Sequence, residues 1–370
     1  MKSPFCLVYI ILMTTCFSCS KEAHEINLKW NKAYNDDTIE RSITGLKWAL
    51  SYLGSNIASD STLKGISYKN SIITLDINQL GFSEYSKNEL AKLQYIFKTN
   101  ESYKESNNLD LGRYIALTFG NSYHYYAIVG VPESLEQFNQ IYTLDSTKGY
   151  INNSSVSKVE RIISFSMSSK TNRQGFISAE LDSISKDTLE YETMEIMSNG
   201  QLKFGIYNSN GELKEAGNRE ITRAGKPAKC IWCHEVVVQP LFKQQLDRDG
   251  YLDHITFDDT LQYFNKKLQK YQNKNWVDEK FLNKRLHTEL ELLYISFMEP
   301  NLKRISKEWK MSVLEVQQRL KHLKTHQHQE FPFLGNLYHR KDIDQIAPTK
   351  LLEVPEYIRE PSNNEVNLLN

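Results

Sequence analysis

The feature that most constrains this chain is the pattern C-x-x-C-H, which occupies residues 230–234. Cys230 and Cys233 lie three positions apart, so one tight turn can present both thiols to the two vinyl groups of a single porphyrin. His234 follows directly and can place its imidazole against the iron as the proximal ligand. The pattern therefore predicts one covalently attached haem c, bound through Cys230, Cys233 and His234.

Two other interpretations of these cysteines are weaker. A redox-active C-x-x-C usually follows a strand and opens a helix, whereas residues 219–229 are polar and contain Gly225 and Pro227. Zinc needs four nitrogen or sulfur ligands, and neither a second C-x-x-C nor an H-x-x-x-H lies near residues 230–234. Haem c therefore remains the favoured cofactor.

Residues 230–241, from the C-x-x-C-H pattern through Pro240-Leu241, resemble c-type cytochrome domains. In class I cytochromes, a proline downstream of the motif accepts a hydrogen bond from the proximal histidine through its carbonyl. The resemblance implies this role for Pro240, which would fix the tautomer of His234. It also implies a helical haem region and a role in electron transfer.

The sixth iron ligand separates the functions that a haem site can perform. A methionine or histidine there favours electron transfer, whereas an open position favours binding or activation of small molecules. We expect Met298 as the distal ligand because it precedes Glu299-Pro300 at the end of a predicted helix. The alternatives are plain core packing of that methionine or ligation by Met311, His254, His287, His322, His326 or His328.

Residues 1–18 are predicted to be a lipoprotein signal peptide. Lys2 supplies a positive charge, and residues 5–17 are apolar but too short to span a bilayer core of about 30 Å. The end of this segment resembles a bacterial lipobox, with Ser18 before Cys19, so Cys19 is the expected lipidation site. Residues 19–36 would then be a tether. We expect attachment to the membrane by lipid alone.

Cysteine usage and charge agree with an exported, soluble domain. Of the five cysteines, two would leave with the signal and Cys19 would carry lipid, so the mature chain keeps Cys230 and Cys233. Haem c is attached outside the cytoplasmic membrane, in the bacterial cell envelope. The 45 basic and 45 acidic residues balance, which gives no electrostatic case for nucleic acid as a partner.

The part of the chain after the tether is predicted to mix helices and strands. A capping box at residues 37–40, followed by apolar residues at helical spacing, predicts a helix that ends at Gly54. Residues 71–80 alternate as in a strand, and residues 86–97 return to helical spacing.

The middle of the chain is predicted to be an antiparallel sheet. Residues 113–119 and 123–131 are rich in β-forming residues and are predicted to pair as a hairpin. Asn199-Gly200 is a strong signal for a type I′ hairpin turn. The other predicted strands are residues 161–167, 175–181, 194–197 and 202–207.

The last part of the chain is predicted to be helical. Between residues 261 and 320, apolar residues recur every three or four positions, which predicts three amphipathic helices interrupted near residues 275–276 and 299–301. The predicted fold class is therefore α+β. The expected divisions are an α+β or antiparallel β domain at 37–217, a helical cytochrome c-like haem domain at 218–330 and an extended tail at 331–370.

Together these features predict a monohaem c-type cytochrome lipoprotein that transfers single electrons to an envelope redox partner protein. The alternatives are an envelope haem enzyme, peroxidase-like or oxidase-like with an open distal site, and a haem-based sensor or surface binding protein. The lipid anchor could hold the protein at the periplasmic face or at the outer surface of the outer membrane. The length exceeds what a simple electron carrier needs.

Overall fold

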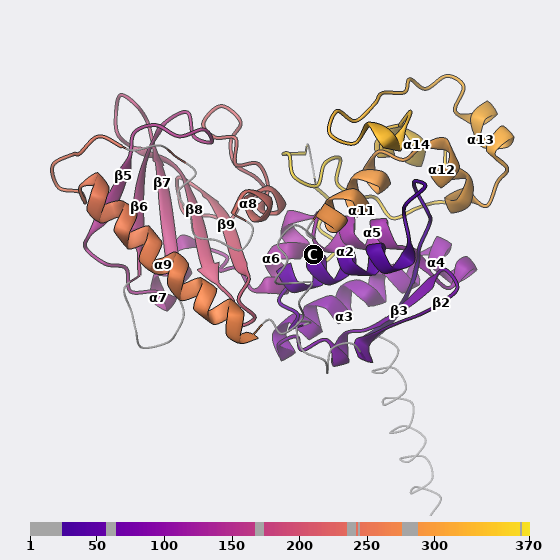
Figure 1. The fold of residues 1–370 in the computed structure, drawn as a ribbon, viewed down its shortest axis with the longest axis horizontal. Coiled ribbons are helices and arrows are strands. Elements are labelled where there is room, and N and C mark those ends of the chain that lie inside the picture. The colour runs from indigo at the N-terminus through magenta and orange to yellow at the C-terminus, as the bar shows by residue number, and fades with distance from the viewer. Residues whose placement is uncertain are drawn as a thin grey trace, which may run out of the picture.

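The protein has an α+β fold with two sheets, each associated with its own set of helices (Figure 1). This computed structural model describes residues 24–56, 64–166, 174–234, 242, 245–275, 288–362 and 365–370. Pro240, Cys19 and the predicted signal peptide lie outside these ranges. No helix within them is both long and apolar enough to cross a membrane.

The first sheet carries the N-terminal helices. Its strand order is β2-β3-β1-β4, in which β1 pairs antiparallel with β3 and parallel with β4. The strands are β1 (Glu25–Lys29), β2 (Ile66–Lys69), β3 (Ile72–Asp76) and β4 (Leu109–Asp110), and the helices are α2 (Ile39–Tyr52), α3 (Glu84–Thr99) and α4 (Glu101–Ser106).

The predictions for this region are confirmed, with small changes at the ends. The N-cap of α2 is Thr38, whose side chain accepts a hydrogen bond from the backbone N–H of Arg41. The predicted helix at 86–97 is the centre of α3, which Ser83 caps. The predicted strand at 71–80 is β3, which ends at Asp76 because that carboxylate caps a short 3₁₀ turn, Ile77–Gln79.

The predicted hairpin at 113–131 is wrong, because both segments are helices. They form α5 (Leu111–Thr118) and α6 (Ser122–Val129). The Asp110 carboxylate accepts hydrogen bonds from the N–H groups of the first turn of α5, and the Asn121 side chain caps α6 in the same way. Every residue of α5 is buried, so the helix has no polar stripe to reveal its period.

The second sheet is antiparallel throughout, as predicted, and the predicted strands at 161–167, 175–181 and 202–207 are confirmed with small changes at their ends. The strand predicted at 194–197 begins earlier, at Thr188, and β5 was not predicted. The strand order is β5-β6-β7-β8-β9, and the connection at Asn199-Gly200 joins β8 to β9. Gly200 has a φ of +86° but Asn199 does not have a positive φ, so the predicted hairpin is confirmed and its predicted type I′ turn is wrong. The strands are β5 (Lys148–Ile151), β6 (Glu160–Phe165), β7 (Gly175–Leu181), β8 (Thr188–Ile196) and β9 (Leu202–Asn208).

Helices cover both faces of this sheet. On one face, Phe264 of α9 (His254–Asn275) packs on Phe165 and Phe176, with ring centroids 6.0 and 5.0 Å apart. On the other face, Phe138 of α7 (Leu135–Ile141) and the following Tyr142 pack with Ile177. The face beneath α9 is the one that forms the candidate site.

Helix α11 (Thr288–Met298) packs against α2 and α5, far from it in sequence. Glycines allow this close approach. A Cβ atom at Gly45 of α2 would lie 2.7 Å from the carbonyl oxygen of Glu289, and one at Gly112 of α5 would overlap the Phe297 side chain. The helix from the last third of the chain is thus part of the N-terminal layer.

The predicted third C-terminal helix is two helices. Lys310 adopts a left-handed conformation with a φ of 53°, which ends α12 (Leu302–Trp309), and Ser312 with Glu315 forms the capping box of α13 (Val313–Arg319). A short helix, α14 (Arg340–Asp344), follows. Residues 345–362 and 365–370 form neither helix nor strand.

A buried ionic network joins α5, α12 and α14. The carboxylate of Glu308 lies 2.6 Å from Arg304 Nη1 and 2.7 Å from Arg340 Nη1. Arg340 is fully buried and also donates to the backbone carbonyl of Phe297. Burial alone would raise the pKa of Glu308, but Arg340, Arg304 and Arg113 outweigh burial and lower the pKa to about 2.

Replacing Glu308 by Gln should lower the free energy of unfolding at pH 7 by about 3–5 kcal/mol, because it leaves buried guanidinium groups without their partner. The carboxylate stabilises the fold fully above its ordinary pKa of 4.5, and this contribution is lost as the pH falls towards 2. The difference between wild type and Glu308→Gln should therefore shrink over that window. Urea denaturation at a series of pH values measures it.

Glu84→Gln is the matched control, because the Glu84 side chain is 85% exposed and pairs only with Lys87 at the surface. It should change the free energy of unfolding by less than about 1 kcal/mol. Equal destabilisation by the two variants would show that the network adds no more than a surface ion pair.

Candidate functional site

The C-x-x-C-H residues lie on α8 (Pro227–His234), a short helix beside β9 and α6 (Figure 1). Pro227 begins the helix, where its missing N–H is not needed. The preceding residue, Lys226, is fully buried, and its ammonium group donates to the carbonyls of Gly120 and Tyr357 at 2.5 and 2.9 Å. It also pairs with the carboxylate of Glu365. These contacts fix where α8 starts.

The structure brings the three predicted haem-binding residues together. Cys230 is buried, whereas Cys233 and His234 are partly exposed, and neither cysteine is in a disulfide. All three line one cavity between α8, the second sheet and the start of α9. The His234 ring lies against Phe204 of β9, with centroids 5.5 Å apart.

The cavity has a volume of about 130 Å³, is partly open to solvent and has largely apolar walls. The pairing register of β7, β8 and β9 explains why these strands form the apolar wall of the cavity. Phe176 pairs with Met194, and Met194 pairs with Phe204, so their side chains point to the same face of the sheet. The apolar lining consists of Ile151, Val156, Ile163, Phe176, Ile177, Met194, Phe204, Phe242, Phe257 and Leu261.

One edge of the cavity is charged. Arg161 of β6 and Glu192 of β8 both line it, with Arg161 Nη2 3.3 Å from Glu192 Oε2. Arg161 Nε also lies 2.5 Å from Oε1 of the buried Glu180, which accepts a further hydrogen bond from the Ser157 hydroxyl. Burial and the neighbouring Glu192 carboxylate raise the pKa of Glu180 to about 8.

The two thiols have different surroundings. Burial is the main cause that raises the pKa of the Cys230 thiol well above its ordinary value, and the Glu192 carboxylate adds to this effect. The Cys230 sulfhydryl donates to the carbonyl oxygen of Ala224, at 3.9 Å. Cys230 is therefore held as a protonated thiol at neutral pH.

Met298 does not line this cavity. It lies at the end of α11 and lines a second cavity on the other side of α8. Met311 packs in a separate core formed by α12 and α13, and His254 pairs with Asp247 at 2.8 Å on the surface. His322, His326 and His328 also lie outside the lining of the first cavity, and His287 is outside the described residues.

Met194 is the candidate that sequence reasoning missed. Only methionines and histidines after the motif were considered, whereas Met194 precedes it and lies on a predicted strand. Apart from the two cysteines, Met194 and His234 are the residues of this lining whose side chains ordinarily bind haem iron. Within the described ranges, no group of three or more His, Cys, Asp or Glu side chains could hold a metal ion.

The types of side chain that line the cavity fit a covalently bound haem, but the cavity is smaller than a porphyrin. Two thiols, an imidazole and a thioether face one apolar space, as a c-type haem requires. A volume of about 130 Å³ corresponds to only a few water molecules at about 30 Å³ each. A porphyrin is larger, so part of it would have to extend through the open side.

Comparison with protein-family models, with curated proteins and with solved structures gave no match to this chain.

In the folded protein without haem, Cys233 should react with iodoacetamide at pH 8 at least about tenfold faster than Cys230, because only the thiolate attacks and burial keeps Cys230 protonated. Peptide mass spectrometry of quenched time points measures the two rates. In guanidinium chloride the rates should become equal, which serves as the control. Faster alkylation of Cys230 in the folded protein would contradict the burial described here.

Proposed function

We propose that this chain is a monohaem c-type cytochrome that transfers single electrons to a redox partner protein in the bacterial cell envelope. The observation that carries the proposal is the presence of Cys230, Cys233 and His234 on the wall of one apolar, aromatic cavity. Two thioether bonds and one axial imidazole require these three groups to face the same space. A sequence pattern that arose by chance would have no reason to face such a space.

Each residue of the site has a defined task in this proposal. Cys230 and Cys233 would anchor the macrocycle edge, and His234 would bind the iron, with Phe204 restricting rotation of the imidazole. The apolar walls would exclude water from the iron and favour a fixed coordination. When bound, haem c would supply an iron centre that takes up and releases one electron.

The surroundings of Cys230 argue against a thiol–disulfide oxidoreductase. Such enzymes need an attacking thiolate that is accessible and has a lowered pKa. Cys230 is buried, and its pKa is raised. Cys233, the seventh residue of α8, lies beyond its first turn and away from the positive end of the helix. Zinc is disfavoured because, within the described ranges, no group of three or more His, Cys, Asp or Glu side chains is placed to hold a metal ion.

We further propose Met194, in place of Met298, as the sixth ligand. Met194 shares the cavity with His234, and its cross-strand neighbour Phe204 touches the His234 ring. A thioether ligand supports reversible electron transfer by keeping the iron six-coordinate in both oxidation states. The lipid anchor at Cys19, the hydrogen bond from His234 to Pro240 and the envelope location are parts of the same proposal.

The mature protein, expressed with a haem c maturation system, should carry one covalently bound haem. Intact mass and a pyridine haemochrome spectrum measure it. The variant Cys230→Ala/Cys233→Ala should carry none, because no thioether can form. Wild type expressed without the maturation system is the control for adventitious haem. Unmodified thiols at both positions in the matured wild type would sink the proposal.

The ferrous wild type should not bind carbon monoxide, whereas ferrous Met194→Ala should bind it, because the sixth coordination position of the iron becomes open. The change is seen as a new absorption spectrum on adding the gas. Met298→Leu is the matched control and should leave the ferrous protein inert. If instead Met298→Leu binds carbon monoxide and Met194→Ala does not, Met298 is the sixth ligand, as the sequence predicts.

A further inference from the structure

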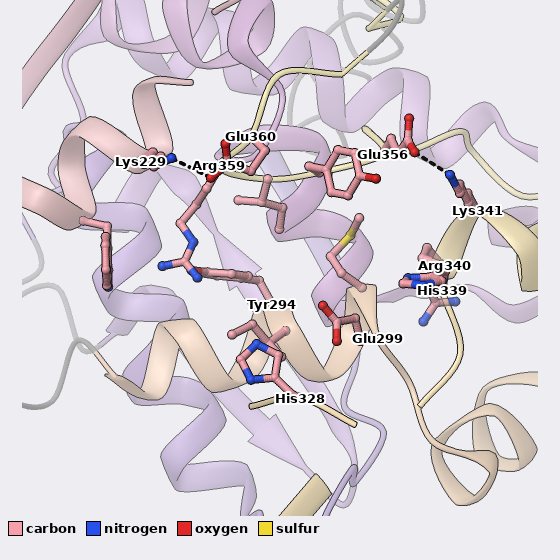
Figure 2. Close-up of a pocket in the computed structure, with 15 residues that line it drawn as sticks. Lys229, Tyr294, Glu299, His328, His339, Arg340, Lys341, Glu356, Arg359 and Glu360 are labelled. Carbon is pink, nitrogen blue, oxygen red and sulfur yellow. Dashed lines mark hydrogen bonds and ion pairs between the residues drawn. The ribbon is translucent and has the colours of Figure 1, made fainter. Parts of the chain in front are cut away.

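A second cavity, of about 380 Å³, lies on the opposite side of α8 (Figure 2). This volume is within the range of small-molecule sites. Its lining comes from α8, from α11 and from the C-terminal segment around residues 356–360. Figure 2 shows Lys229, Arg359 and Glu360 grouped on one side of the cavity, with Tyr294 beside the guanidinium group of Arg359. This side of the lining indicates what the cavity can bind.

The guanidinium group of Arg359 has hydrogen-bonding capacity that the fold leaves unused. It lies 4.7 Å from the ring centroid of Trp232 and 5.5 Å from that of Tyr294, so the two rings restrict its movement. Its Nη1 lies 3.0 Å from Oε1 of Glu291, but this buried oxygen accepts no hydrogen bond from any described residue. A guanidinium group carries five N–H donors in a planar fork, so donors remain for a further acceptor.

The hydroxyl group of Tyr294 is a second unused donor. The residue is 6% exposed, and its hydroxyl has no hydrogen-bond partner in the part of the chain that the structure describes. Burial raises the pKa of this phenol well above its ordinary value, so the hydroxyl stays protonated and can donate. A buried hydroxyl without a partner costs free energy, which an acceptor on a ligand would recover.

The acceptor that matches a guanidinium fork is a carboxylate. Glu291 does not prevent a second carboxylate from binding to Arg359, because one guanidinium group can pair with two. In this chain Arg340 lies 2.7 Å from Glu308 and 3.3 Å from Asp344.

Lys229 can add a further positive charge to the same side of the cavity. Its ammonium group lies 2.6 Å from Glu360, whose side chain is 49% exposed, whereas that of Lys229 is 20% exposed. An ion pair of this kind is weak, and Glu360 is the partner that can turn to solvent when a ligand carboxylate approaches. This side of the lining therefore favours an anion.

The apolar part of the lining favours an anion with a flat ring. Trp232 and Tyr357 line the cavity and are 38% and 42% exposed, and Ile295, Met298 and Ile358 add aliphatic surface. An aromatic ring of a ligand can pack against these two side chains. An inorganic anion would leave them uncovered.

We propose that the second cavity binds a small aromatic carboxylate of the benzoate class. Its carboxylate accepts hydrogen bonds from the Arg359 guanidinium group and the Tyr294 hydroxyl, and its ring packs against Trp232 and Tyr357. Binding is non-covalent and needs no haem, so it is independent of the proposed function. Because Trp232 stands between the two cysteines on α8, the ligand would contact the helix that carries the C-x-x-C-H residues.

Binding is tested by titrating benzoate in a calorimeter into the mature protein, expressed without the haem c maturation system. Saturable binding is expected. Tyr294→Phe should weaken it by about three- to tenfold, because one hydrogen bond is lost and the ring remains. Arg359→Gln should weaken it by about tenfold to a hundredfold, because a charged donor is lost. Arg359→Lys, which keeps the charge without the planar fork, should fall between wild type and Arg359→Gln.

Arg223→Gln is the matched control, because it removes an exposed arginine outside the cavity lining. It should bind benzoate as tightly as wild type. Thermal unfolding of each variant checks that the fold is kept. Tyr294→Phe removes a hydroxyl that has no partner in the described residues, so this variant tests the site even if Arg359→Gln weakens the fold.

Two other ligands test the chemical class. Benzyl alcohol has the same ring without the charge, and inorganic phosphate has charge without a ring. Each should bind at least about tenfold more weakly than benzoate, because each loses one of the two sets of contacts.

Four outcomes would overturn the proposal. No saturable binding of benzoate, or equal affinity in wild type, Tyr294→Phe and Arg359→Gln, excludes this cavity as the site. A loss in Arg223→Gln as large as that in Arg359→Gln shows attraction by general surface charge. Benzyl alcohol that binds as tightly as benzoate excludes recognition of the carboxylate, and phosphate that binds more tightly than benzoate excludes the aromatic class.

Discussion

The position of α8 depends on the buried amine of Lys226, whose pKa burial lowers to about 7. A charge with no solvent exposure is tolerated only when partners surround it. Here the partners come from three places: the α5–α6 connection through Gly120, the C-terminal segment through Tyr357, and Glu365 close to the last residue. Segments that are distant in sequence therefore have to meet at the residue that precedes α8.

This arrangement leaves a cavity on each side of α8. The cysteines and His234 line an apolar space beside the second sheet, and Trp232 lines a space beside the C-terminal segment. The β-strands form a wall of the first cavity, and α11 with the C-terminal segment forms the second.

Local signals explain what could be predicted. The second sheet could be predicted because β7 and the turn at Asn199-Gly200 are determined by residues close in sequence. The C-x-x-C-H motif could be recognised because it depends only on the spacing of three residues. Helix α5 was missed because burial on all sides hides its period, and α6 because its tyrosines and β-branched residues favour a strand. Only Asp110 and Asn121 mark where the two helices start. Met194 was missed because it shares a cavity with His234 only through the pairing of β8 with β9, which places Met194 beside Phe204.

The contacts of Lys226 also bear on the order of events during synthesis. Because Glu365 and Tyr357 complete the surroundings of Lys226, α8 gains these contacts only after almost the whole chain has been synthesised. The strands β5–β9 precede α8 in the chain, whereas these two partners follow Lys226 by 139 and 131 residues. The final placement of the C-x-x-C-H residues is thus tied to the arrival of the C-terminus.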